Sequence, residues 1–154
     1  MKLAILSDVH GDVEALRDAL AQVERLDCVV AVCGGDIVDF GPYPGRTIAL
    51  LRERGIPCIR GNHDRWATAR GRPEPGALDD SALAWLRELP TGWDATLDGV
   101  RVAVRHGTPK SDFEGIDPTL ATDADLRRWL DQAEADVLVV GHTHLPFARK
   151  VWGG

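Results

Sequence analysis

The chain has 154 residues, of which 44% are apolar and 27% are charged. This length and composition predict one globular domain over residues 1–154. The formal net charge of −6 argues against stable binding to nucleic acid, because a polyanion-binding surface needs a basic excess. The three cysteines form no C-x-x-C pair, and no apolar run is long enough for a membrane helix. We therefore expect a cytoplasmic protein that does not contact a membrane.

The first half of the chain alternates short apolar runs with segments of helical spacing. Leu3–Leu6 is a continuous apolar run, as in a strand that is buried on both faces, and residues 28–33 form a second such run. Residues 12–24 and 44–54 carry apolar side chains at helical intervals, which predicts two helices. Residues 56–59 predict a third strand.

The next stretch predicts a loop, a helix and a hairpin. Residues 71–76 are rich in Arg, Pro and Gly, which is typical of a loop. A helix is predicted to begin at residue 79 or 80, where an aspartate can cap it, and to end at residue 89. Asp98-Gly99 lies between the apolar runs 93–97 and 100–104 and is a strong hairpin-turn signal.

The last predicted elements are a capped helix and a buried strand. Thr122 and Asp125 resemble a capping box that opens a helix to about residue 135. Val137–Val140 is then the final full apolar run. This alternation of strands and amphipathic helices indicates an α/β fold with a mainly parallel sheet and an added hairpin.

Polar side chains that can bind a metal follow the predicted strands. All five histidines of the chain are among them, and the set is Asp8, His10, Asp36, Asn62, His63, Asp64, His106, His142 and His144. Ligands of open α/β sheets bind beyond the carboxyl ends of the strands, so we expect these side chains to meet at one edge. Taken singly, each motif can be an ordinary turn or helix cap. The gathering of every histidine at strand ends favours a functional site.

The donor types indicate a metal centre. Imidazole and carboxylate groups without sulfur favour zinc, iron, manganese or a similar ion. In Asp8-x-His10 and His142-x-His144, alternate residues of an extended segment are expected to point the same way. The donors exceed the four that a tetrahedral zinc takes, which predicts two ions that share a bridge. Such centres hydrolyse phosphate esters, and their positive charge accommodates a small anionic substrate.

Five ordered blocks resemble the calcineurin-like metallophosphoesterases. They span residues 8–144 and read Asp8-x-His10, Gly35-Asp36-x-x-Asp39, Gly61-Asn62-His63-Asp64, His106-Gly107 and Gly141-His142-x-His144. Residues 41–44 and 145–147 are similar to the small prokaryotic phosphodiesterase-type branch. The resemblance implies an α/β, two-sheet sandwich flanked by helices. It also implies a phosphodiesterase whose nucleophile is a hydroxide bridging two divalent ions (Mn, Fe, Zn, Ni or Co, with Mn favoured).

The resemblance also implies roles for the individual residues. The first metal would be held by Asp8, His10, Asp36 and His144. The second metal would be held by Asp36, Asn62, His106 and His142, so that Asp36 bridges. The catalytic pair would be His63, which faces the phosphate, and Asp64, which orients the imidazole. Asp39 would be a carboxylate that accepts a hydrogen bond from a ligand histidine, or else a turn residue.

Two departures from the family pattern bear on function. Phe40 stands where the Ser/Thr protein phosphatases carry Arg, and Asp64 stands where they carry Glu, so protein phosphatase activity is disfavoured. The chain stops soon after His144, which predicts shortened C-terminal strands, with residues 147–152 as an edge strand that promotes homodimerisation. Trp66 is expected to pack beside the site, with stacking on a nucleobase as the alternative.

Two other functions remain open from the sequence. A phosphomonoesterase, acting on nucleotides or phosphoproteins, would use the same metal site. A protein-binding scaffold of the same fold is the non-enzymatic alternative, and it is disfavoured because the chain keeps all the histidines that such scaffolds lose. Hydrolysis of a diester compared with a monoester would separate these possibilities.

Overall fold

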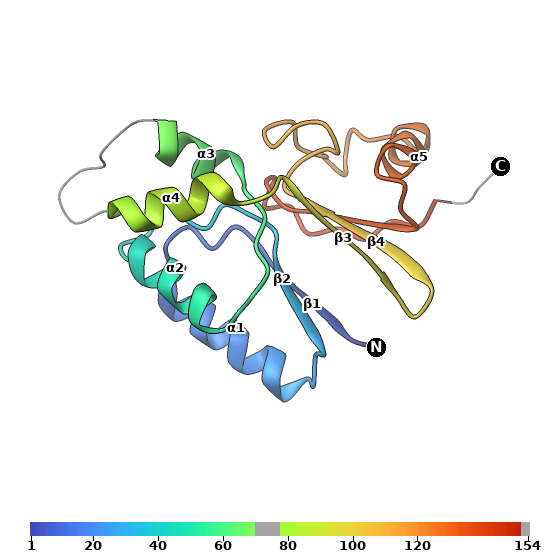
Figure 1. Ribbon diagram of the computed structural model, residues 1–154. Helices are drawn as coiled ribbons and strands as arrows, with labels where there is room; N and C mark the ends of the chain where they lie inside the picture. The colour runs from blue at the N-terminus through green and yellow to red at the C-terminus, as the bar shows by residue number, and fades with distance from the viewer. Residues whose placement is uncertain (70–77, 152–154) are drawn as a thin grey trace.

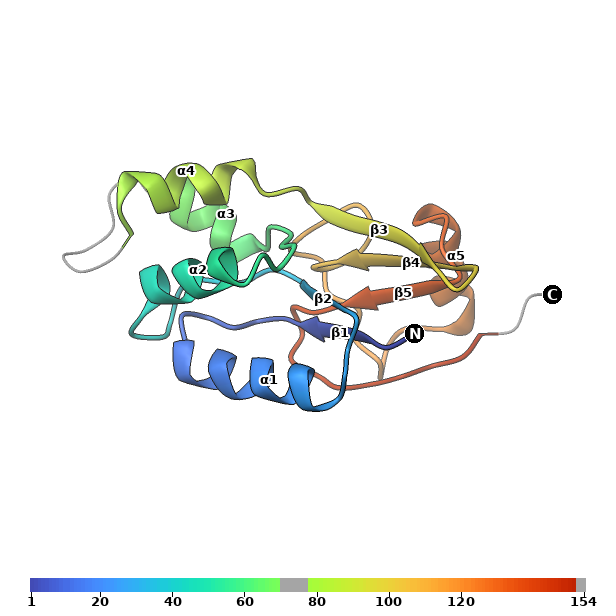
Figure 2. The ribbon, with the colours of Figure 1, turned by 60° about the horizontal axis from the view of Figure 1, so that its bottom comes forward.

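The computed structural model describes residues 1–69 and 78–151. In chain order its elements are β1 (Leu3–Leu6), α1 (Val13–Arg25), β2 (Val30–Cys33), α2 (Pro44–Glu53), α3 (Asn62–Ala69), α4 (Asp80–Glu88), β3 (Gly92–Leu97), β4 (Val100–Arg105), α5 (Asp123–Gln132) and β5 (Val137–Val140). Figures 1 and 2 both show α1–α4 gathered on one side of the molecule and α5 beyond the strands β3–β5 on the other.

The strands form two small sheets. β1 and β2 pair in parallel, while β4 pairs antiparallel with β3 and in parallel with β5. The predicted α/β fold with two sheets and flanking helices is therefore confirmed. The parallel pairs matter for function because their carboxyl ends deliver several loops to one place.

Local sequence signals account for many of the element boundaries. Asp79 accepts a hydrogen bond from an amide of the first turn of α4, and Thr122 and Asp125 form the predicted capping box of α5. Asp98 and Gly99 both have positive φ, at 49° and 83°, which is the backbone that a two-residue hairpin turn needs. These short-range predictions are confirmed.

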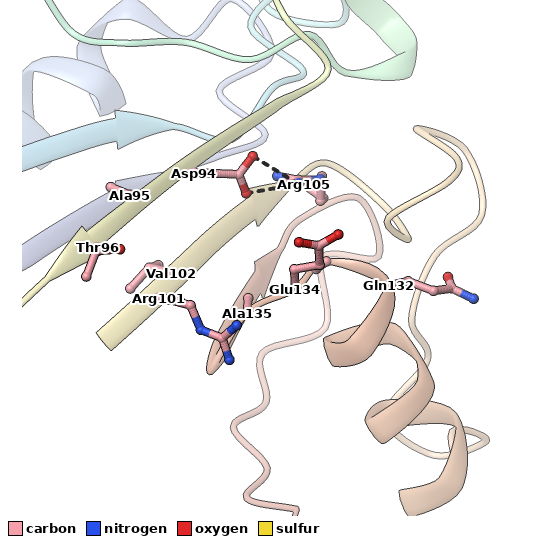
Figure 3. Close-up of a pocket in the computed structure, with 10 residues that line it drawn as sticks. Asp94, Ala95, Thr96, Arg101, Val102, Arg105, Gln132, Glu134 and Ala135 are labelled. Atoms are coloured by element: carbon pink, nitrogen blue, oxygen red, sulfur yellow. Dashed lines mark hydrogen bonds and ion pairs between the residues drawn. The ribbon is translucent and has the colours of Figure 1, made fainter. Parts of the chain in front are cut away.

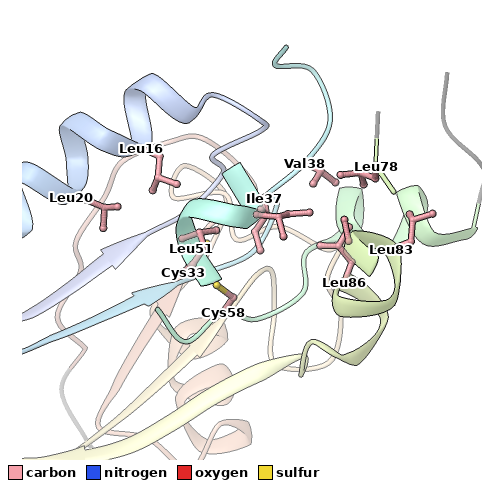
Figure 4. Packing of buried hydrophobic residues seen from close by; sticks show 12 residues of the cluster. Leu16, Leu20, Cys33, Ile37, Val38, Leu51, Cys58, Leu78, Leu83 and Leu86 are labelled. Atoms are coloured by element: carbon pink, nitrogen blue, oxygen red, sulfur yellow. The ribbon is translucent and has the colours of Figure 1, made fainter. Parts of the chain in front are cut away.

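The main hydrophobic core lies between the helices and β2 (Figure 4). Leu16 of α1, Leu51 of α2 and Leu86 of α4 belong to this cluster and are almost completely buried. Cys33 and Cys58 lie in the same cluster, so two of the three cysteines are core residues as expected. A hydrogen bond with the neighbouring Cys33 raises the pKa of the Cys58 thiol, and burial raises it further.

A smaller core joins the two sheets. Val32 of β2 and Val104 of β4 are buried in one cluster with Ile59, and Trp93 of β3 packs against it. The sheets therefore meet through apolar side chains, in agreement with the predicted sandwich. This contact fixes the strand ends of one sheet relative to those of the other.

Several predicted elements differ in the structure. Residues 56–59 form a single bridge from Cys58 to Cys33 and no regular strand, because Pro57 offers no amide to a ladder. Residues 147–151 do not form the predicted edge strand, and Trp152 lies outside the described residues. The predicted loop at residues 71–76 also lies outside them. Helix α3 was not predicted from the sequence.

A membrane span is not found among the helices of the described residues, since none of them combines enough length with enough hydrophobicity.

Candidate metal centre

The loops that leave the parallel strands converge on the candidate site. Asp8 follows β1 and donates its amide to the carbonyl of Gly35 at 3.0 Å. The amide of His10 donates to the carbonyl of Asp36, after β2, at 2.9 Å. The amide of His142, after β5, donates to the carboxylate of Asp8 at 3.1 Å. The first, second and fifth sequence blocks are thereby held together by the backbone.

The candidate ligands divide into two clusters. Within each cluster one donor atom per residue lies within 4.8 Å of all the others, and the clusters are Asp8, His10 and His144, and Asp36, His106 and His142. The second cluster is the more deeply buried. Each cluster contains three of the four residues that the family resemblance implied for one metal, with Asp36 grouped only in the second cluster and Asn62 in neither.

Asp36 lies beside both clusters. One of its carboxylate oxygens is 3.1 Å from Nε2 of His106 and 3.8 Å from Nε2 of His10. Burial raises the pKa of Asp36, but the hydrogen bond and charge of His106 outweigh burial and lower the pKa overall. The Asp36 carboxylate is therefore ionised, and it lies where it could contact a metal ion in either cluster.

The pKa values of the two histidines in the second cluster are shifted in opposite directions. Burial lowers the pKa of His106, but hydrogen bonding to Asp36 reverses the effect and the pKa is raised overall. Burial, together with the nearby His106, lowers the pKa of His142. A metal ion must displace the second proton of a charged imidazole, because only the neutral ring has a free nitrogen lone pair to act as a ligand.

The surroundings of Asn62 fit a cation. Its Oδ1 faces Nε2 of His106 at 3.1 Å, and its buried Nδ2 has no hydrogen-bond partner within the described residues. A buried N–H group in this state lacks an acceptor, such as a water molecule or a substrate oxygen, so Oδ1 is the atom of Asn62 that a cation would use. An ion that took Oδ1 and Nε2 as ligands would use two lone pairs that face each other. The second cluster, extended by Asn62, therefore fits a divalent metal.

The expected geometry of the D-x-H and H-x-H pairs was wrong. Asp8, His10, His142 and His144 all have positive φ, between 49° and 69°, so neither segment is extended. The left-handed backbone turns each chain back on itself at the strand end. Asp8 and His10 nevertheless share one cluster, whereas His142 and His144 lie in different clusters.

The carboxylate that contacts His63 is Asp39. Oδ2 of Asp39 lies 2.9 Å from Nδ1 of His63. Asp64, which was predicted to orient this imidazole, is completely buried and accepts hydrogen bonds from the amides of Ile37, Val38 and Gly61. Burial raises the pKa of Asp64 to about 6, against the opposing effect of the Gly61 amide. Asp64 points inward because His63 and Asp64 are consecutive residues of α3 and face different sides of the helix.

Cavities border the site and also lie away from it. A cavity of about 290 Å³ beside the second cluster is lined by His106, Thr108 and Lys110. A cavity of about 640 Å³ lies against the hairpin instead, where Arg105 is paired with Asp94 (Figure 3). None of the candidate metal ligands lines this hairpin cavity, whereas His106 lines the smaller one.

The α/β fold thus places at its strand ends two groups of imidazole and carboxylate donors that could each hold a divalent metal ion. Residues 1–153 match the calcineurin-like phosphoesterase superfamily domain, and the chain belongs to this family.

Relatives of known structure and sequence agree with this assignment. A metallophosphoesterase from Sphaerobacter thermophilus has 30% sequence identity and a TM-score of 0.72, over 95% of this chain and 62% of that protein. The uncharacterized protein MJ0912 of Methanocaldococcus jannaschii is 25% identical over 98% of this chain and 65% of its own length. The E. coli phosphoesterase Yfce shares the fold at 24% identity and a TM-score of 0.60, over 98% of this chain and 75% of that one. The chain thus spans about two thirds of the length of the first two relatives.

Proposed function

We propose that the protein hydrolyses phosphate esters, preferring diesters, with two divalent metal ions as cofactors and manganese favoured. The observation that carries the proposal is the position of Asp36, whose carboxylate lies beside donors of both clusters. When bound there, two ions polarise the phosphoryl oxygens and activate a water molecule as the nucleophile. Membership of the phosphoesterase family supports the same reaction class.

The proposed role of His63 is to hold a proton for the departing oxygen. Its Nδ1 is engaged by Asp39, which fixes the ring orientation and leaves Nε2 for the substrate. The amide of His63 donates to Oδ1 of Asp36 at 2.9 Å, so the imidazole is anchored next to the shared carboxylate. Proton donation from Nε2 would stabilise the leaving alkoxide.

The proposal is tested with a diester and a monoester of the same leaving group. We expect manganese-dependent release of 4-nitrophenolate from bis(4-nitrophenyl) phosphate to be faster than from 4-nitrophenyl phosphate. A chelator should abolish the release, and added manganese should restore it. A faster reaction with the monoester would identify a phosphomonoesterase, and no reaction with either ester would favour the scaffold function.

Asp36→Asn tests the shared carboxylate directly. The variant keeps the size of the side chain but removes the charge, and we expect it to bind fewer than two manganese ions and to lose activity. His144→Ala should be less severe, because His144 belongs to one cluster only. Calorimetric titration with manganese measures the number of ions bound.

Asp18→Asn, an exposed carboxylate on α1, is the matched control and should behave as the wild type. Two ions bound by Asp36→Asn with wild-type activity would contradict the shared role of this carboxylate.

A further inference from the structure

Two strongly exposed phenylalanines lie at the edge of the metal centre. Phe40 is 81% exposed and Phe113 is 59% exposed, more than any other aromatic side chain of the described residues. The ring of Phe40 lies 4.9 Å from that of His10 and 4.8 Å from that of His63. The ring of Phe113 lies 5.7 Å from that of His142. Both rings therefore touch imidazoles of the proposed site while keeping much of their surface open to solvent.

Trp66 contacts Phe113 directly and is linked to Phe40 through the ring of His63. Its ring centroid is 4.8 Å from that of His63 and 5.6 Å from that of Phe113. Trp66 is half-buried, so part of its ring surface is open to solvent. We call Phe40, Trp66 and Phe113 the aromatic rim.

The Phe113 side of the aromatic rim is held in place by polar contacts. Arg65 donates two hydrogen bonds to Asp112, at 2.7 and 2.8 Å. These residues immediately precede Trp66 and Phe113, so this pair sets the two aromatic rings against each other. The amide of Phe113 also donates to Oγ of Ser111. An exposed ring on a loop that is held by hydrogen bonds favours ligand binding, because the loop loses little conformational freedom when a ligand binds.

The Phe40 side is held by an unusual backbone. Phe40 has a φ of 60° and Asp39 has a φ of 80°, which is an unfavourable conformation for residues with bulky side chains. Gly41 follows, and a Cβ there would collide with the carbonyl oxygen of His10. Strained backbone of this kind concentrates at functional sites, where the surrounding structure imposes it. Here it fixes an apolar ring at the mouth of the site.

From these contacts we infer that the aromatic rim binds a planar aromatic group carried by the phosphate ester. The inference rests on the proposed function, since the metal centre would hold the phosphate that brings the group to the rim. Flat rings stack on aromatic side chains more favourably than saturated rings of similar size, because their quadrupoles are complementary. The ligand class is thus a phosphate ester of a nucleoside or of another planar ring.

The test uses phosphonates, which the enzyme cannot hydrolyse because the carbon–phosphorus bond replaces the ester. Phenylphosphonate and cyclohexylphosphonate are compared by calorimetry on the manganese-loaded protein. We expect the phenyl compound to bind about 2- to 10-fold more tightly, as stacking adds to the burial that both rings share. Using the ratio of the two dissociation constants cancels any change in phosphate or metal binding.

Phe40→Leu and Phe113→Leu remove the aromatic rings but keep apolar side chains. In each variant we expect the ratio to fall towards 1. Leu120→Ala is the control, because Leu120 is 77% exposed and lies in the turn before α5, and it should keep the wild-type ratio.

A third ligand distinguishes the two sources of a planar ring. 9-(2-Phosphonoethyl)adenine should bind more tightly than phenylphosphonate if the natural substrate is a nucleotide, and less tightly if it is an aryl ester. A contribution of one stacked base corresponds to an affinity change of about 5- to 100-fold on substitution of the stacking residue.

Three results would overturn the inference: a wild-type ratio near 1, a ratio unchanged in both leucine variants, or no phosphonate binding. Failure of the proposed function is detected separately, by the absence of 4-nitrophenolate release. Hydrolysis without aromatic preference would reject the aromatic rim alone. Aromatic preference without hydrolysis would reject the proposed function alone.

Discussion

At the scale of single residues, two carboxylates make different contacts: Asp39 contacts the imidazole of His63, and Asp64 accepts hydrogen bonds from three backbone amides. His63→Ala should keep its manganese and lose about 10²- to 10⁴-fold in kcat, the usual contribution of a general acid or base. Asp39→Asn should also keep its manganese and lose about 10- to 100-fold, since it removes only the orienting hydrogen bond. Metal content and kcat on esters with good and poor leaving groups measure both effects. The loss should be larger for poor leaving groups, which need the proton.

Asp64→Asn and His10→Ala are the comparisons that make this test decisive. Asp64→Asn should destabilise the fold by about 1–3 kcal/mol, because three backbone amides depend on that carboxylate. His10→Ala should lose metal from the first cluster. If His63→Ala loses metal as His10→Ala does, His63 is a ligand. If Asp64→Asn lowers kcat without changing stability, the original assignment of the orienting residue was right.

At the scale of elements, Gly61 marks a tight junction at the site. A Cβ at Gly61 would lie 2.2 Å from Oδ1 of Asp36 and 2.4 Å from its amide nitrogen, so the loop before α3 and the loop after β2 touch through bare backbone. Gly61→Ala should therefore displace Asp36 and weaken manganese binding at least 10-fold. Calorimetric titration measures the change.

The control for this prediction is Gly45→Ala in α2, where a Cβ would meet nothing within 4 Å. There the substitution should leave metal binding unchanged and stabilise the protein by about 0.5–1 kcal/mol, as alanine favours helix. Equal metal binding by the two variants would refute the importance of the junction.

The start of β5 is joined to β4 by an ion pair that predicts a pH dependence. The side chain of Arg101 contacts Asp136 at 2.6 Å, and this hydrogen bonding lowers the pKa of Asp136 to about 2. An aspartate in the unfolded chain has a pKa of about 3.9, so the pair stabilises the fold at any pH above this pKa. The stabilisation should be lost as the pH falls from about 4 to 2.

Asp136→Asn should remove this part of the pH dependence, measured as the free energy of unfolding in urea between pH 2 and 6. Arg101→Met should have the same effect, because it removes the other partner of the pair. Arg105→Met, which breaks the neighbouring pair with Asp94, serves as the control for loss of an arginine from β4. An unchanged pH profile in Asp136→Asn would show that the pair does not contribute.

Elements with local signals could be predicted from the sequence, and elements defined by distant contacts could not. The capping box at Thr122 and the turn at Asp98 act within a few residues, so their sequences suffice. Helix α3 has little apolar periodicity, and its first turn is stabilised through contacts of Asp64 with distant backbone. The positive φ of His10 and His144 likewise depends on where the strands end in space.

At the scale of the whole molecule, metal binding should be coupled to folding. The donors come from segments between residues 8 and 144, and an unfolded chain cannot hold them together. Manganese at 100 times its dissociation constant should stabilise the native state by about 2.7 kcal/mol per site. For a chain of this size the shift in Tm is then about 5–10 °C for each occupied site. Scanning calorimetry with and without manganese measures it, and an equal shift in Asp36→Asn would contradict the coupling.

The ordering of the site along the chain was visible in the residues at the strand ends, whereas its division into two sets came from the family resemblance. Histidines and aspartates at successive strand ends predicted one shared edge, because parallel strands bring their carboxyl ends together. The left-handed backbone at His142 and His144 was not predicted, since both were expected in an extended segment. The pairing of Asp39 with His63 required the register of two loops far apart in sequence.

The separation of the first and last ligands along the chain also has a consequence for biosynthesis. Asp8 and His142 are joined through the His142 amide, although they are 134 positions apart in the sequence. On the ribosome, Asp8 and His10 emerge early and must wait for His144 before the first cluster can form. A prematurely terminated product therefore carries no complete first cluster, whatever else of it has folded. The proposed first metal can therefore bind to its complete set of ligands only in chains that have been translated beyond His144.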